Sequence, residues 1–60
     1  MDKYEDILHY SIDAKFTSDA LKHWCLASQD GDEKAKECVV RCIDKFRSYV
    51  EGMGKAISGE

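Results

Sequence analysis

The amino-acid sequence predicts an all-α fold: a helical hairpin with a long amphipathic C-terminal helix plus a short N-terminal helix. Three observations predict this fold. The second half of the chain carries a long apolar stripe at helical spacing, a polar turn signal precedes the stripe, and the chain contains no proline. Sixty residues form at most one small domain, residues 1–60, and a core of this size leaves a monomer only marginally stable.

The N-terminal segment, residues 2–15, has two interpretations. As a helix, with acidic residues in its first turn, it places four large apolar side chains on one face: Tyr4, Ile7, Leu8 and Ile12. As a strand, residues 8–16 alternate apolar and polar residues without exception, and the apolar positions are Leu8, Tyr10, Ile12, Ala14 and Phe16. We favour the helix and keep the strand as the alternative.

A middle helix follows a predicted break. In one straight helix over residues 4–27, the apolar residues before Thr17 would point away from those after it. We therefore expect a break at Thr17-Ser18-Asp19 and a helix from near Asp19 to about Ser28. Trp24 shares a face with Leu21 and Cys25, where it either anchors this helix to the next one or contacts a partner.

The long helix begins after the turn signal Ser28-Gln29-Asp30-Gly31-Asp32, where an aspartate can cap it. At about 100° per residue, an arc of about 140° on this helix is apolar and free of charge. We call this arc the apolar stripe, and its members are Ala35, Cys38, Val39, Cys42, Ile43, Phe46, Tyr49, Val50, Met53, Ala56 and Ile57. Gly52 and Gly54 weaken the last turns, so a frayed tail is expected from about residue 52.

The three cysteines predict core packing rather than a metal site or disulfides. Three is an odd number, which disfavours a secreted disulfide framework and favours a reducing, cytoplasmic location. Cys38 and Cys42 lie within the apolar stripe, and His23 and Cys25 project about 160° apart on a helix, so four zinc ligands do not converge. We expect no metal and no other cofactor.

No residue cluster specifies a reaction, so we expect that the chain is not an enzyme. No cysteine has an evident activating partner, and no glycine-rich phosphate loop is present. The net charge of −3 disfavours binding to nucleic acid or an anionic membrane and favours protein partners. No stretch approaches the ~20 apolar residues that a membrane span requires.

The segment from Asp30 to Cys38 is similar to the turn of the plasmid-encoded Rop family, whose chains pair helical hairpins into a four-helix dimer and bind RNA. The residues that agree with the family pattern are Asp30, Asp32, Glu33, Ala35 and Cys38. The resemblance implies self-association. It ends beyond Cys38, because Lys45 and Gly52 stand where continued heptads require apolar residues. The family's basic and aromatic RNA contacts have little counterpart here, since residues 10–18 offer Lys15 beside Asp13.

With residues 8–16 as a strand, the element order resembles that of the ribbon-helix-helix repressors, a β-α-α dimer that inserts its ribbon into the DNA major groove. The resemblance implies that the outward residues His9, Ser11, Asp13 and Lys15 would read DNA. An acidic residue on that face counts against this alternative.

A short, acidic chain without catalytic residues also resembles the small early accessory proteins with which temperate, lambda-like bacteriophages redirect host factors. The sequence therefore leads us to expect a regulatory protein that forms a dimer and binds another protein. A small dimeric nucleic-acid-binding regulator is the alternative. The expected contact residues are Trp24, Phe46, Tyr49, Val50 and Met53.

Overall fold

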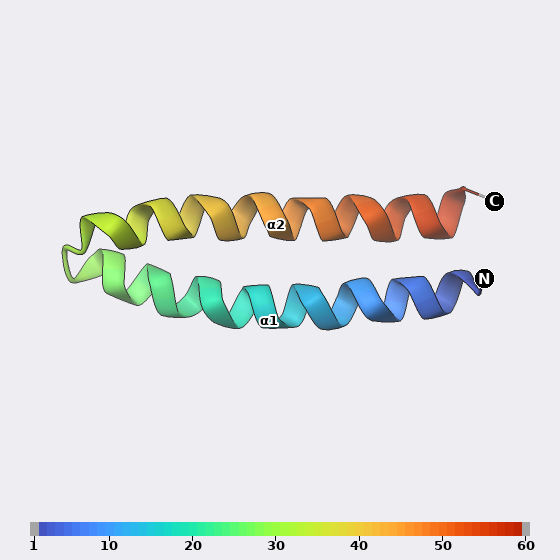
Figure 1. Cartoon of the computed structure of the whole chain (residues 1–60), viewed down its shortest axis with the longest axis horizontal. Helices are drawn as coiled ribbons and strands as arrows, with labels where there is room; N and C mark the ends of the chain where they lie inside the picture. Colours follow the sequence, from blue (N-terminus) through green and yellow to red (C-terminus); the bar gives the residue numbers. More distant parts are fainter. Residues whose placement is uncertain (1, 60) are drawn as a thin grey trace.

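The computed structural model describes residues 2–59 and contains two long helices, α1 (Lys3–Gln29) and α2 (Glu33–Ser58). They lie side by side and antiparallel, with the turn at one end and both termini at the other (Figure 1). The chain forms a single layer whose Cα atoms extend over 45 × 14 × 11 Å. The prediction of an all-helical hairpin is confirmed. Met1 and Glu60, the ends of the predicted domain, lie outside the described residues.

The turn between the helices is held by backbone hydrogen bonds that its sequence permits. The Asp32 amide donates to the Ala27 carbonyl at 3.2 Å, and the Gly31 amide donates to the Ser28 carbonyl at 3.0 Å. These two bonds form a Schellman motif, which requires a left-handed residue after the helix end, and Gly31 supplies it with φ of 95°. The Asp32 carboxylate then caps α2 by accepting from the amides of Lys34 and Ala35. The predicted turn and start of the second helix are confirmed.

The predicted break at Thr17-Ser18-Asp19 is wrong, because α1 runs through these residues without interruption. The separate short N-terminal helix is therefore also wrong. Neither glycine nor proline occurs between Lys3 and Gln29, so nothing in the backbone ends the helix, and Thr17 itself is buried against α2. The alternative strand over residues 8–16 is wrong as well, since this segment is helical and residues 2–59 contain no strand.

The buried positions of the seam between α1 and α2 carry small side chains. The buried residues are Ala14 and Thr17 of α1 with Ala35 and Cys42 of α2. No large side chain in residues 2–59 is fully buried. Small residues let two helices approach closely, but they remove little apolar surface from water. The hairpin therefore has a thin core along its whole length.

Near the termini, a glycine on α2 leaves space for an aromatic ring of α1. Tyr10 lies over Gly52, and a Cβ atom built on Gly52 would stand 2.5 Å from the Cζ atom of Tyr10. The Tyr10 and Tyr49 ring centroids are 6.4 Å apart, with the rings tilted by 42°. Gly52 thus creates the space that seats Tyr10 on α2.

The last turns of α2 remain helical to Ser58 in the structure. The Gly59 amide donates to the Lys55 carbonyl at 2.7 Å, and the Ser58 hydroxyl donates to the Gly54 carbonyl. The fraying expected from about residue 52 concerns how often these turns open, and it stays a prediction.

Candidate interaction surfaces

Part of the apolar stripe on α2 is left uncovered by α1. We define the α2 row as the six residues that follow one another in alternating steps of four and three: Val39, Ile43, Phe46, Val50, Met53 and Ile57. Val39 and Met53 are half-buried, whereas the other four remain between 38% and 48% exposed. Other members of the stripe, Ala35, Cys38, Cys42, Tyr49 and Ala56, are buried or half-buried. One edge of the stripe therefore forms the seam and the other edge contacts solvent.

The structure brings together some of the predicted contact residues and separates others. Phe46 and Val50 lie one turn apart and are exposed, while Tyr49 and Met53 are half-buried. Trp24 lies on the other helix and is half-buried, and the centroid of its ring is 4.8 Å from that of the His23 ring. Because Tyr10 meets Gly52, the register of the hairpin places Trp24 near residue 38, about 12 Å along the axis from Phe46. Trp24 therefore does not belong to the cluster around Phe46.

A second uncovered surface lies on α1. We define the α1 row as Tyr4, Leu8, Ile12 and Phe16, which follow one another at four-residue intervals. They are 64%, 56%, 45% and 68% exposed, because the seam uses the opposite side of α1, around Ala14 and Thr17. The sequence analysis placed Tyr4, Leu8 and Ile12 on one face of a separate N-terminal helix that ends before a break. In one straight helix these residues point away from the apolar residues after Thr17. That opposition was the sequence signal that α1 carries two apolar faces.

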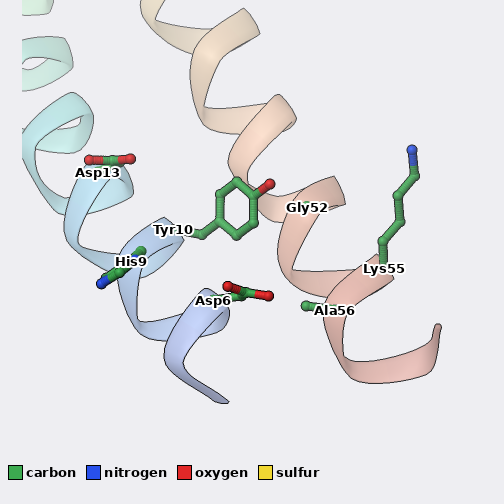
Figure 2. A pocket seen from close by; sticks show the side chains of 7 residues that line it. All are labelled: Asp6, His9, Tyr10, Asp13, Gly52, Lys55 and Ala56. Carbon is green, nitrogen blue, oxygen red and sulfur yellow. The ribbon is translucent and has the colours of Figure 1, made fainter. Parts of the chain in front are cut away.

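A shallow cleft opens between the helices near the termini (Figure 2). Its volume is about 500 Å³, and its lining residues are Asp6, His9, Tyr10, Asp13, Gly52, Lys55 and Ala56. In Figure 2 the Tyr10 ring lies between the helices, and the acidic side chains and His9 extend from α1. Sequence reasoning did not single out this cleft, which results from the pairing of Tyr10 with Gly52.

The cysteines lie at three different depths. Cys42 is buried in the seam, Cys38 is half-buried and Cys25 is exposed, and none of them forms a disulfide. Within residues 2–59, no three histidine, cysteine or acidic side chains are grouped so that they could hold a metal ion.

Comparisons with protein-family models, curated proteins and solved structures found no match to this chain. Neither α1 nor α2, within the part of the chain that is described, has the length and apolar character needed to cross a membrane. The two exposed apolar rows are therefore the surfaces of this chain from which a function can be proposed.

Proposed function

We propose that this chain is a small non-enzymatic binding protein that acts through helix-mediated association with protein chains. One observation carries the proposal: both helices leave large apolar side chains about half exposed, while, within residues 2–59, the buried positions between them hold only alanine, cysteine and threonine. The largest exposed apolar patch of a small protein is often an interaction site. The α2 row, with Phe46 and Val50 at its centre, and the α1 row are the proposed contact surfaces.

The proposed role is regulatory: the chain would alter the activity of a protein by occupying a surface on it. A hairpin of this size offers two helical faces for contact, which suits an accessory protein such as the phage-encoded proteins that target host factors. Helices with apolar anchors at intervals of three and four residues are a recurrent means of protein recognition.

Photo-crosslinking in cells that express the protein tests this function. We would replace Phe46 or Phe16 by p-benzoylphenylalanine, one position in each row, and Lys45 as a control on the exposed polar side of α2. Covalent adducts with protein, whether a second copy or a different chain, are expected from the row positions and not from residue 45. Absence of protein adducts at both row positions, or salt-dependent adducts with nucleic acid, would contradict the proposal.

A pair of charge substitutions gives a second test. Phe46→Asp should abolish association or unfold the hairpin, because it places a charge in the α2 row, while Lys45→Asp should be nearly silent. Analytical ultracentrifugation and circular dichroism would measure both effects. Equal tolerance of the two substitutions would remove the α2 row from the contact surface.

A further inference from the structure

The α2 row has a spacing that reads the same in both directions. Its six residues follow in steps of four, three, four, three and four. Alternating steps of this kind keep a row nearly straight along a helix, so a second helix can cover it over its whole length, about 27 Å. The α1 row advances in steps of four, drifts about 40° around the helix at each step, and suits a short crossing contact instead.

Because few side chains are buried between α1 and α2, the chain would gain stability from a partner that covers its exposed apolar surface. Four buried residues, none of them larger than threonine or cysteine, form the core of a 60-residue chain. Chains of this size often gain stability from a disulfide, a metal or a further chain, and the described residues provide neither of the first two. A second copy is present wherever the protein is made, so it can supply this cover without another gene product.

On these grounds we infer that the occupant of the α2 row is the α2 row of a second copy, packed antiparallel around a two-fold axis at the level of Ser48. This inference rests on the proposed function and names the partner of one of its two surfaces. In this register Phe46 faces Val50, Ile43 faces Met53 and Val39 faces Ile57 of the other copy. Each row residue thereby meets another row residue, as a self-complementary interface requires.

Layer volumes favour the antiparallel pairing over the parallel one. In the antiparallel register, each layer joins a larger side chain to a smaller or similar one, so the layers have nearly equal volume. Parallel pairing would instead join Phe46 to Phe46 and Val50 to Val50, giving overfilled and underfilled layers that pack poorly. Antiparallel helices also place opposite ends of their dipoles together.

The surface beside Val39 has room for the residue that this register brings there. A hollow of about 320 Å³ is lined by Cys25, Ser28, Gln29, Lys36 and Val39. The pairing places Ile57 of the second copy over Val39, at this hollow. An apolar side chain from the other copy would fill it near the turn.

The exposed area of the row is smaller than that of a standard interface. Four large side chains that are 38% to 48% exposed present on the order of 350 Å² of apolar surface. A standard interface buries about 800 Å² on each partner. Val39, Met53 and the aliphatic parts of Lys36 and Arg47 beside the row supply further area. The association is therefore expected at the weaker end of specific interfaces.

Ultracentrifugation and isotope-filtered NMR on the unmodified chain test this inference. We expect the sedimenting mass to rise to that of a dimer with concentration. In a mixture of ¹³C-labelled and unlabelled chain, contacts between copies should join the Phe46 ring to Val50 methyl groups and Ile43 to Met53. A monomer at millimolar concentration would overturn the inference. Contacts between Phe46 of one copy and Phe46 of the other, as parallel pairing would give, would overturn it as well. Contacts between copies that involve the α1 row would do the same.

A matched pair of variants localises the interface. Phe46→Asp should weaken dimerisation by about tenfold or more, whereas Phe16→Asp, in the α1 row, should leave it unchanged. Equal weakening by both variants would overturn the assignment to the α2 row. If the chain proves monomeric but residue 46 or 16 still crosslinks to a different protein, the second copy is excluded while the proposed function stands.

Discussion

The two ends of the hairpin are held by different kinds of interaction. At the turn, backbone hydrogen bonds of the Schellman motif and the Asp32 cap define the path of the chain. At the end with the termini, the helices meet through the Tyr10 ring over Gly52, and Tyr4 and Ile57 remain 64% and 47% exposed. The turn is thus specified by local sequence, whereas the other end depends on side chains from distant positions and on surface that is still uncovered.

The largest effect expected from a change at the turn is that of Gly31→Val. A β-branched residue is strongly disfavoured at φ of 95°, so we expect the free energy of unfolding to fall by about 2 kcal/mol. Thermal unfolding followed by circular dichroism would measure this loss. Gly31→Asn, which tolerates the left-handed region better, is the control and should lose less. Equal stability of both variants with the unmodified chain would show that the turn does not limit stability.

The next effect concerns the cap of α2. Asp32→Ala removes the carboxylate that accepts from the Lys34 and Ala35 amides, and we expect a loss of about 1 kcal/mol in the free energy of unfolding. Asp30→Ala is the matched control, because the cap bonds at this turn use the Asp30 backbone and the Asp32 side chain. Urea unfolding of both variants measures the difference. A larger loss of unfolding free energy for Asp30→Ala would show that the capping carboxylate is not that of Asp32.

Two neighbouring glycines at the other end should respond oppositely to the same change. Gly54→Ala should stabilise the protein by about 0.5–1 kcal/mol, because alanine favours a helix and a Cβ there meets open space. Gly52→Ala should give no such gain, since its Cβ would displace the Tyr10 ring. In a Tyr10→Ala background the gain from Gly52→Ala should return. Identical stabilisation by both alanines in the unmodified background would show that the Tyr10 contact contributes nothing.

The smallest effect is one of local opening. We expect backbone amides of residues 55–58 to exchange hydrogen faster than those of residues 40–50, because Gly52 and Gly54 lower helix propensity and the last turns have little cover. Hydrogen exchange followed by NMR would measure the difference residue by residue. Uniform protection along α2 would contradict the predicted fraying from about residue 52.

The turn and α2 could be predicted because the turn residues, the capping residue and the apolar pattern all place the start of the helix at the same point. Asp30, Gly31 and Asp32 carry turn and cap chemistry, and the apolar stripe begins directly after them. The sequence pattern divided α1 wrongly, because its apolar residues were expected to share one face. In the structure Phe16 stays 68% exposed while Thr17 is buried, so the helix keeps its hydrogen bonds and leaves the α1 row in water. Local backbone propensity prevailed over burial.

The contact between Tyr10 and Gly52 could not be predicted from periodicity. Gly52 stands at a position where a heptad pattern requires an apolar side chain, and the sequence alone gives no sign that a tyrosine 42 positions earlier fills that space. For the same reason the cleft beside Tyr10 was missed. Of the predicted contact residues, Phe46 and Val50 are exposed, Tyr49, Met53 and Trp24 are half-buried, and the binding role of all five stays a prediction.

The arrangement of the hairpin as one layer of two helices also limits how its sequence can change. In a larger domain, residues that hold the fold and residues that meet a partner are separated by several side chains. Here Cys42 of the seam and Ile43 of the α2 row are neighbours on one helix. A substitution that tunes recognition is therefore rarely free of a cost in folding. Selection on such a protein would act on both properties at once, and compensating changes should be found across the seam rather than along the surface.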